Sequence, residues 1–318
     1  MERLRTLLAT ALEKRHLLYE NPSTNCFRLF NGDGDGLGGL TLDWYGGYLL
    51  VQYFDDALDG ITDEITALID SNAAAFPALP RGVLLKKRPG PGTGGVAIAA
   101  AAKSVLLSGE APPRDFYVKQ NGVRAAVDLM EGQNTGVFLD MRGVRDRLEG
   151  YYTPRDRMLN LFCYTALFSV HALMCGSGGA VNVDLSKGVL ARARANYVLN
   201  GLRVDDRDFV YGDSLDWIRR FQKKGTRFSF VLFDPPTFSR NRRRTFSVKR
   251  HYASALGILA GIVGPGWVLT SINSPSISLD EYRGFHPGGW KCEFVEHEPL
   301  DFPTPGPPYL KAGLWRLP

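Results

Sequence analysis

The feature that most constrains the fold is an alternation of short apolar runs and helix-like stretches in the second half of the chain. The runs that have the character of strands are 158–162, 180–184, 209–211, 228–233 and 266–270. The stretches between them that favour helices are 168–175, 189–200, 215–221 and 252–262. Strands separated by helices of this length need crossover connections and form a mainly parallel sheet. We therefore predict an α/β fold with a doubly wound, Rossmann-like sheet.

The first third of the chain has a different pattern. Apolar residues on one helical face predict a helix over 1–20, and a second amphipathic helix is predicted from Ile61 to Ile69. Short strands are expected over 24–53, with a tight hairpin at the glycine-rich turn 31–39. A stretch rich in Pro, Gly and Ala follows, over 77–113. It predicts a boundary between a small α+β domain at 1–113 and a catalytic domain at 114–318.

Composition and charge narrow the range of functions. The net charge of +5 and the pI near 9.0 permit a polyanionic partner without requiring one. The four cysteines lie far apart and form no CxxC pair, so neither a disulfide framework nor a metal site is indicated. The glycine-rich turn lacks the glutamate that closes a calcium loop. With no signal peptide and no long apolar run, we expect a soluble, cytoplasmic protein without membrane contact.

The run Val-Leu-Phe-Asp-Pro-Pro-Thr-Phe-Ser at 231–239 is the strongest local sign of function. An apolar strand ends at Asp234, and the two prolines that follow hold the chain extended. Asp234 and the carbonyl of Pro235 can accept hydrogen bonds from the edge of a nucleobase. Phe238 can stack on the face of the base, which is worth about 1–3 kcal/mol. This arrangement is typical of enzymes that methylate nucleobases, although the same residues also suit a plain turn at a strand end.

Acidic residues follow two other predicted strands. In a doubly wound sheet, ligands bind beyond the carboxyl ends of the strands, and an acid at the end of the second strand can accept both ribose hydroxyls. Asp184 has that position, and Asp213 lies where an adenine amino group would be. The glycine fingerprint for a dinucleotide is missing, which favours a nucleoside cofactor without phosphates, S-adenosylmethionine. The alternative is that both acids only cap the helices that follow them.

Five motifs in order make residues 115–318 resemble a class I S-adenosylmethionine-dependent methyltransferase of the bacterial 23S ribosomal RNA type. They are Glu131-Gly-Gln-Asn-Thr-Gly-Val-Phe-Leu-Asp-Met-Arg142, Asn160-Leu-Phe-Cys-Tyr-Thr165, Val183-Asp-Leu-Ser186, Asn196 with Asn200-Gly-Leu202, and Asp234-Pro-Pro-Thr-Phe-Ser239. The front domain resembles the small domain that precedes the catalytic one in that family, while the PUA module that opens many relatives is expected to be absent.

The resemblance implies a set of residues that bind the cofactor. These are Gln133, Thr135, Gly136, Phe138, Asp140, Arg142, Asn160, Tyr164, Thr165, Asp184, Ser186 and Asp213. Asn160, Tyr164 and Thr165 would approach the methionine end, Asp184 the ribose and Asp213 the adenine. The family usually has glycine after the Tyr-Thr pair, whereas this chain has Ala166. We expect that methyl group to weaken cofactor binding without abolishing it.

The residue at position 273 bears on which atom is methylated. Methylation of cytosine C5 needs a cysteine thiolate that attacks C6. In the cytosine branch of the family that cysteine follows the strand after Asp-Pro-Pro, and this chain has Asn273 there. We interpret Cys292 as a buried structural cysteine. A ring nitrogen needs only alignment with the methyl donor, so we expect a nitrogen target, guanine N7 in particular, with Asp234 and Asn273 on the base edge. The motif Glu131-Gly132-Gln133 nevertheless looks like the cytosine branch.

A basic run follows the predicted base pocket. Its cations are Arg240, Arg242, Arg243, Arg244, Lys249 and Arg250. They could bind RNA phosphates, with Phe246 or Tyr252 stacking on flanking bases and Lys86–Arg88 extending the track. A solvated loop is the alternative. The expected partner is 23S ribosomal RNA or its precursor particle, and a homodimer is left open. A factor for ribosome assembly with decayed catalysis, and a methyltransferase for small molecules or proteins, are the rival functions.

Overall fold

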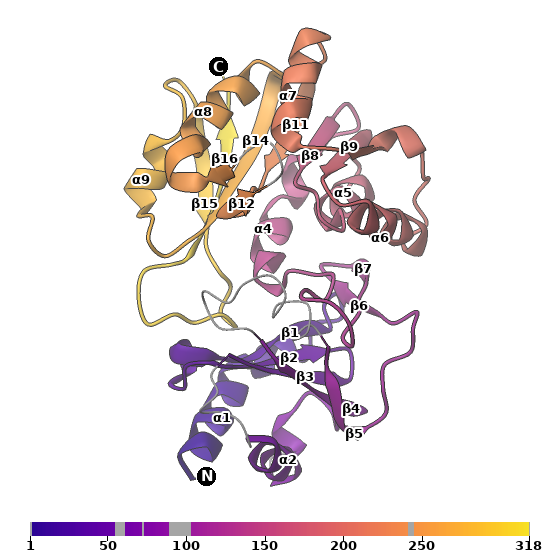
Figure 1. Cartoon of the computed structure of the whole chain (residues 1–318), viewed down its shortest axis with the longest axis vertical. Helices are drawn as coiled ribbons and strands as arrows, with labels where there is room; N and C mark the ends of the chain where they lie inside the picture. The colour runs from indigo at the N-terminus through magenta and orange to yellow at the C-terminus, as the bar shows by residue number, and fades with distance from the viewer. Residues whose placement is uncertain (1, 55–60, 72, 89–102, 241–244, 318) are drawn as a thin grey trace. The chain divides into compact units, whose positions relative to one another are not determined.

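The computed structural model describes residues 2–54, 61–71, 73–88, 103–240 and 245–317. The chain forms two compact units, coloured by residue number in Figure 1. Unit 1 comprises Met1–Arg142 and Pro299–Pro305, and unit 2 comprises Gly143–Glu298 and Gly306–Pro318. Within the described ranges, no helix has both the length and the apolar character needed to cross a membrane.

Unit 2 is built on a seven-stranded sheet in the order β10-β9-β8-β11-β14-β16-β15. The strands are β8 (Arg157–Leu161), β9 (Gly179–Asp184), β10 (Phe209–Tyr211), β11 (Phe228–Phe233), β14 (Val263–Asn273), β15 (Lys291–Glu296) and β16 (Leu310–Arg316). The five strands from β10 to β14 are parallel, whereas β16 runs antiparallel to both of its neighbours. The mainly parallel, doubly wound sheet confirms the predicted fold class.

Helices connect these strands and cover the sheet (Figure 1). They are α5 (Leu167–Met174), α6 (Lys187–Leu199), α7 (Ser214–Lys223), α8 (Val248–Ala260) and α9 (Leu279–Gly284), preceded by α4 (Arg142–Arg147). Apolar residues of α7 and α8 pack with those of β8, β9, β11 and β14 into one core cluster. On another side of β11, Phe230 contacts Tyr152, which in turn contacts His171 of α5. Burial of this surface from water is the main favourable term in folding.

Unit 1 contains a five-stranded sheet in the order β1-β2-β3-β4-β5. Its strands are β1 (Cys26–Asn31), β2 (Leu40–Tyr45), β3 (Tyr48–Tyr53), β4 (Gly82–Lys87) and β5 (Val105–Gly109). Only the β3–β4 pair is parallel. The helices α1 (Glu2–Arg15) and α2 (Ile61–Ser71) contribute apolar residues to the core cluster of this sheet. The predicted tight hairpin at 31–39 is instead a longer connection that includes a 3-10 turn, Gly32–Asp35.

A separate hairpin of β6 (Tyr117–Gln120) and β7 (Val123–Ala126) also belongs to unit 1. Its turn residues Asn121 and Gly122 both have positive φ, as a two-residue hairpin turn requires. Backbone hydrogen bonds tie it to the start of the chain, Asn25 N to Lys119 O at 2.8 Å and Gly122 N to Ser23 O at 2.9 Å. Compactness therefore groups residues 114–142 with unit 1, while the limits of the catalytic domain stay a prediction.

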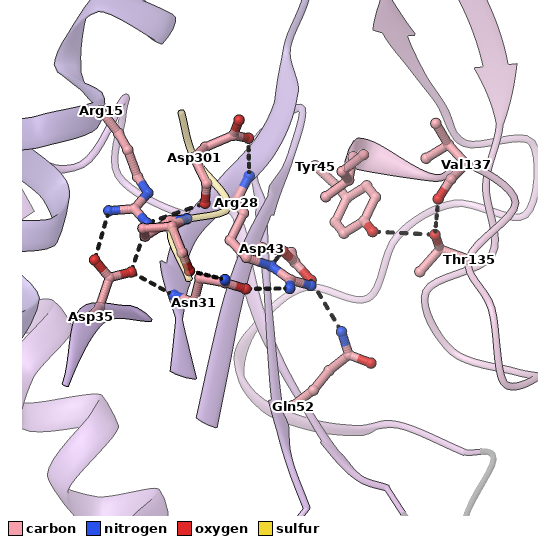
Figure 2. A network of polar contacts seen from close by, with 12 residues as sticks. Arg15, Arg28, Asn31, Asp35, Asp43, Tyr45, Gln52, Thr135, Val137 and Asp301 are labelled. Carbon is pink, nitrogen blue, oxygen red and sulfur yellow. Dashed lines mark hydrogen bonds and ion pairs between the residues drawn. The ribbon is translucent and has the colours of Figure 1, made fainter. Parts of the chain in front are cut away.

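The segment Pro299–Pro305, which connects β15 to β16, also packs in unit 1 (Figure 2). Asp301 is completely buried and forms a bidentate ion pair with Arg142, with N–O distances of 2.5 and 3.1 Å. Its carboxylate also accepts the Arg28 backbone N–H at 3.0 Å, and its carbonyl accepts a guanidinium N–H of Arg15 at 3.1 Å. Four segments of unit 1 therefore meet at one aspartate.

Candidate functional site

The carboxyl ends of the parallel strands define the candidate site in unit 2. The strand order reverses between β8 and β11, and ligands of such sheets bind in the crevice outside the carboxyl ends at that point. The loop after β8 has an unusual backbone there, because Phe162, Tyr164 and Ala166 all have positive φ values of 58°, 49° and 59°. Left-handed non-glycine residues cluster at functional sites. This loop is therefore a strong candidate for contact with a ligand.

The backbone conformation of Ala166 explains why glycine would suit this position. It is completely buried and immediately precedes α5. Its N–H donates to the carbonyl of Cys163 at 2.8 Å, and its own carbonyl accepts from Val170 at 2.9 Å. A β-carbon in the left-handed conformation costs about 1–2 kcal/mol, which glycine avoids. The alanine therefore strains the loop directly.

Asp184 at the end of β9 has the geometry of a ribose acceptor. One carboxylate oxygen accepts the N–H of Tyr164 at 3.0 Å and the other accepts the N–H of Ser186 at 2.9 Å. Each ionised oxygen can accept a further hydrogen bond, so the side chain can still accept two hydroxyl groups. Partial burial raises the pKa of Asp184, and these backbone N–H groups offset part of that effect. The neighbouring Leu185 is 51% exposed and offers an apolar surface that the sequence reasoning missed.

Asp213 and Ser186 both cap helices, as the alternative interpretation anticipated for Asp213. The Asp213 carboxylate accepts the N–H groups of Leu215 and Asp216 at the start of α7, at 2.9 and 3.1 Å. Ser186 accepts the N–H of Val189 at 3.3 Å at the start of α6. A cap fixes the position of the side chain and does not prevent a contact with adenine, so the cofactor role of Asp213 stays a prediction.

Asn160 is buried and its amide group points into a polar network beneath the loop. It donates to Ser169 at 2.9 Å, Ser169 donates to Asn182 at 2.7 Å, and Asn182 donates to the hydroxyl of Tyr197 at 2.9 Å. The Oδ1 atom of Asn160 has no hydrogen-bond partner among the residues that the structure describes. An orphaned buried acceptor of this kind calls for a partner.

Thr165 is also buried, and the structure holds it through its backbone. Asn196 of α6 donates its side-chain N–H to the carbonyl of Thr165 at 2.9 Å. The motif asparagine Asn196 therefore anchors the loop after β8 from a neighbouring helix. The adjacent Asn200 caps the same helix and donates to the Asn196 carbonyl at 2.7 Å.

The loop after β11 and the end of β14 lie side by side. The Thr237 hydroxyl donates to the carbonyl of Asn273 at 2.7 Å, and Asn273 itself is exposed. The Ser271 hydroxyl donates to the carboxylate of Asp234, and Pro235 is buried beside it. The structure thus brings Asp234 and Asn273, which are far apart in sequence, to the ends of adjacent strands. Ser271 is a partner of Asp234 that no sequence signal indicated.

The predicted RNA-binding run is only partly described. Arg242, Arg243 and Arg244 lie outside the described residues, as do the side chains of Phe238 and Arg240. The backbone of β12 (Phe238–Arg240) pairs with β13 (Thr245–Ser247), and Lys249 and Arg250 are exposed at the start of α8.

The prediction that Phe246 or Tyr252 stacks on RNA bases is wrong. Phe246 is 4% exposed and Tyr252 is fully buried. Tyr252 donates its hydroxyl to the carbonyl of Ser271 at 2.8 Å, and both rings belong to the core of unit 2. Tyr252 lies on the apolar face of α8 that covers the sheet, and Phe246 lies just before that helix, in β13 (Thr245–Ser247).

The second group of predicted cofactor residues, from Gln133 to Arg142, belongs to unit 1. Two basic residues of the β4 region hold the start of this segment. Lys86 donates to the carbonyl of Gly132 at 3.0 Å, and Arg88 donates to the carbonyl of Gln133. Lys86 is 1% exposed and burial lowers its pKa. The prediction that Lys86 belongs to a surface track for RNA is therefore wrong, because its amine binds the backbone.

The middle of this segment is anchored through Thr135, whose Oγ1 lies 3.2 Å from the hydroxyl of Tyr45 (Figure 2). Thr135 and Gly136 are buried, Asp140 is partly buried, and Phe138 is 42% exposed. Arg142, at the end of the segment, is buried in its ion pair with Asp301. The guanidinium of Arg142 is bound to the carboxylate of Asp301. The contacts of Arg142 therefore show a structural role, which is to support this segment.

Cys292 differs from its predicted role. It is exposed on the edge strand β15, where its thiol lies 3.5 Å from the carbonyl of Phe294. The expectation of a buried structural cysteine is wrong, because an outward-facing position on an edge strand remains in water. Partial burial nevertheless raises the pKa of the Cys292 thiol, which disfavours the reactive thiolate.

Comparison with known proteins identifies the class of protein that this sheet and crevice define. A family model described as S-adenosylmethionine-dependent methyltransferase matches residues 27–314. The "Putative ribosomal RNA large subunit methyltransferase YwbD" of Bacillus subtilis (strain 168) is 33% identical over 285 residues, which cover 89% of this chain and 70% of that protein. Ribosomal RNA large subunit methyltransferase I of Photobacterium profundum is 28% identical over 328 residues, covering 96% of this chain and 78% of that protein.

A solved structure agrees with these sequence comparisons. The crystal structure of SMU.776 complexed with SAH has a TM-score of 0.88 and 27% identity, covering 99% of this chain and 81% of that one. The chain belongs to the S-adenosylmethionine-dependent methyltransferase family. It is an enzyme that uses S-adenosylmethionine. The acceptor carboxylate of Asp184 and the exposed, apolar Leu185 fit a nucleoside cofactor.

Proposed function

We propose that this enzyme methylates a base nitrogen of large-subunit ribosomal RNA, with guanine N7 as the favoured acceptor. The relatives named above as ribosomal RNA large subunit methyltransferases support the RNA class. The observation that carries the choice of atom is Asn273. An amide stands at the end of β14 beside Asp234, at the position where the cytosine branch would need a thiol.

In this proposal Asp234 and Asn273 hold the edge of the base, and Phe238 stacks on its face. The guanine ring nitrogen already carries a lone pair, so the enzyme needs no covalent intermediate on the base. The bound cofactor supplies an electrophilic methyl group on a sulfonium. The contribution of the chain is then alignment, which can account for a large share of a rate enhancement. The hydrogen bonds from Ser271 to Asp234 and from Thr237 to the Asn273 backbone pre-organise that edge.

The cofactor would be held by two sets of residues. In unit 2, Asp184 would accept the ribose hydroxyls, Asp213 would lie near the adenine, and the left-handed loop 162–166 would approach the methionine moiety. The second set, within the segment 133–142, is assigned to the cofactor by the family resemblance alone. A second candidate function, an assembly factor with reduced catalysis, is favoured by one observation, the strained methyl group of Ala166 in that loop.

The test is methyl transfer by the purified protein from labelled S-adenosylmethionine to ribosomal RNA or subunits from a strain that lacks its gene. Nucleoside mass spectrometry should then show 7-methylguanosine, or another base methylated on nitrogen. Asp234→Asn should remove this activity, while the matched surface variant Asp205→Asn should keep it.

Each contrary outcome has its own meaning. A 5-methylcytidine product would contradict the argument from Asn273. Cofactor binding without transfer to any RNA would show that the acceptor is another class of molecule. No cofactor binding at all would support the assembly factor.

A further inference from the structure

A second group of cations lies at the amino ends of the strands of unit 2, the edge of the sheet opposite the candidate site. Arg157 begins β8, and Arg227 directly precedes β11. Arg316 ends the antiparallel strand β16, where it pairs in register with both Trp267 of β14 and Lys291 of β15. The topology therefore brings residues from six separate segments, α7 included, to one edge.

The arginines of this edge are held over aromatic rings. Arg157 lies 5.3 Å from the ring centroid of Phe228, Arg220 lies 4.7 Å from Trp217, Arg316 lies 5.6 Å from Trp267, and Arg147 lies 5.3 Å from Phe294. Such cation–π contacts contribute about 0.5–1 kcal/mol each at exposed sites. They orient a guanidinium and leave the N–H groups at its periphery available to an acceptor.

These rings are themselves connected, so the arginines are not scattered. Phe221 of α7 contacts Phe228 at 5.1 Å between centroids. Tyr151 contacts both Trp267 at 5.1 Å and Phe294 at 5.8 Å. Trp217 contacts Phe221 at 5.5 Å. The rings therefore form two groups, and two of the arginines lie on each group. We call this set of cations the amino-edge surface; its members are Arg147, Arg155, Arg157, Arg220, Lys223, Lys224, Arg227, Lys291 and Arg316.

All the cations of the amino-edge surface are exposed, and none takes part in an ion pair that the structure describes. Some other surface arginines of unit 2 do form ion pairs, since Arg194 pairs with Asp206 and Arg207 with Asp205. The carboxylates at this edge are fewer than the cations. Asp156 and Glu293 accept hydrogen bonds from Ser229 and Tyr151 and keep their negative charges, and Asp208 interacts with Arg157. The nine cations outnumber these three carboxylates, so the edge carries an excess of positive charge.

We propose that the amino-edge surface binds the phosphate backbone of a second segment of the substrate RNA, remote from the nucleotide that is methylated. This inference rests on the proposed function. Phosphate oxygens match the N–H groups of oriented guanidiniums. Strands of about six residues separate the two edges by roughly 20 Å. A large folded RNA can reach both edges at once.

The test compares two triple variants of the full chain that lose the same charge. The test variant is Arg157→Gln, Arg227→Gln and Arg316→Gln. The control variant is Arg194→Gln, Arg207→Gln and Arg283→Gln, in which each arginine has an aspartate partner. Binding of full-length large-subunit ribosomal RNA is measured over a salt series, with cofactor affinity and thermal stability measured in parallel.

We expect the test variant to bind the RNA at least tenfold more weakly at low salt. The slope of log K against log salt should fall by about two, because each released phosphate contact contributes roughly 0.7–0.9. The control variant should change the slope by less than half that amount, and cofactor affinity should not change in either. Equal affinity and slope for the two variants would overturn the inference.

Two further readouts separate this inference from the proposed function. Methyl transfer to RNA by the wild type, with unchanged RNA binding by the test variant, would refute the inference alone. RNA binding by the wild type that falls in the test variant, without any methyl transfer to that RNA, would refute the proposed function alone. Competition by polyglutamate as strong as that by RNA would overturn the assignment in favour of an acidic protein partner.

Discussion

The two units stabilise their buried polar groups by different means. Unit 1 buries ion pairs, in which Arg15 binds Asp35 and Arg142 binds Asp301. The described ion pairs of unit 2 are instead on its surface. Unit 2 also buries the cations Arg145 and Lys311, and many of its other buried polar side chains form neutral networks around Asn182 and Thr270. Burying an unpaired charge costs more free energy than burying a neutral polar group that has lost its hydrogen bond. Unit 1 should therefore be the more sensitive of the two to the loss of a single group.

The position of each network suggests why the units differ. The ion pairs of unit 1 join segments that are distant in sequence, from α1 to the segment 299–305 (Figure 2). The neutral network of Asn160, Ser169 and Asn182 lies instead beneath the loop that follows β8. Charge thus fixes how the chain of unit 1 is assembled, and neutral hydrogen bonds support the candidate site of unit 2. Four variants, Asp301→Ala, Ser169→Ala, His286→Gln and Ala166→Gly, test that contrast.

The largest effect is expected from Asp301→Ala. This change leaves the buried guanidinium of Arg142 without its carboxylate, and breaking a buried pair in this way costs about 3–5 kcal/mol. Urea unfolding measures it, and Asp205→Asn, at an exposed pair, is the control and should show no change beyond the error. Equal stabilities for the two variants would contradict the statement that unit 1 depends on its buried ion pairs.

A smaller loss is expected from Ser169→Ala in the neutral network of unit 2. The hydroxyl accepts from Asn160 and donates to Asn182, so its removal leaves two buried groups unsatisfied, at a cost of about 2 kcal/mol. The exposed Ser254→Ala is the matched control. A loss as large as that of Asp301→Ala would show that neutral networks are no safer than buried ion pairs.

The free energy of unfolding should also decrease as the pH is lowered, because of a buried histidine in unit 2. Burial lowers the pKa of His286 to about 4, where its ring stacks on Trp315 and its Nε2 lies 2.8 Å from Thr270. The unfolded state therefore takes up the proton first as the pH falls below about 6.5. The free energy of unfolding should decrease by at most about 1.4 kcal/mol per pH unit between pH 6.5 and 4.

The variant His286→Gln tests this source of acid sensitivity. Its stability should depend less on pH over the same window, while above pH 7 the wild-type curve should be flat with respect to this group. Unfolding midpoints in urea at several pH values measure both curves. Parallel curves for the two proteins would exclude His286 as the cause.

The smallest effect should be a gain, from Ala166→Gly. Relief of the left-handed alanine should stabilise the protein by about 1 kcal/mol, and titration calorimetry should show tighter cofactor binding. The control is Ala172→Gly in α5, where glycine should cost about 1 kcal/mol. A loss of stability in both variants would show that the loop tolerates the alanine without strain.

Local patterns explain which parts of the fold could be predicted. The strand that ends at Asp184 and the strand that Asp234 follows are short apolar runs with an acid at the end, and these patterns depend only on neighbouring residues. The hairpin turn at Asn121-Gly122 has a local signal of the same kind. The polar ends of parallel strands meet at one edge of any such sheet, so the proximity of Asp234 and Asn273 could also be anticipated.

The wrong predictions have a common physical cause. Each concerns a residue whose burial or binding partner is determined by tertiary packing. The sequence predicts Lys86 as a surface cation, yet its amine donates a hydrogen bond to the backbone carbonyl of Gly132. Tyr252 lies next to a basic run but is buried by the helical face that it shares. Asp301 lies in a proline-rich stretch that resembles a tail, and its partner Arg142 is far away in sequence. No local pattern carries information about contacts of this range.

Because Pro299–Pro305 belongs to unit 1, the folding of that unit depends on a segment that is synthesised late. Unit 1 cannot complete its buried ion pairs until Asp301 has left the ribosome, roughly 160 residues after Arg142, which is on the order of 8–30 s at ordinary rates of translation. Until then Arg142 must stay hydrated or find another anion. The N-terminal unit is thus begun first and finished almost last, so a nascent chain halted between the two residues should be open to proteases in its earliest-made part.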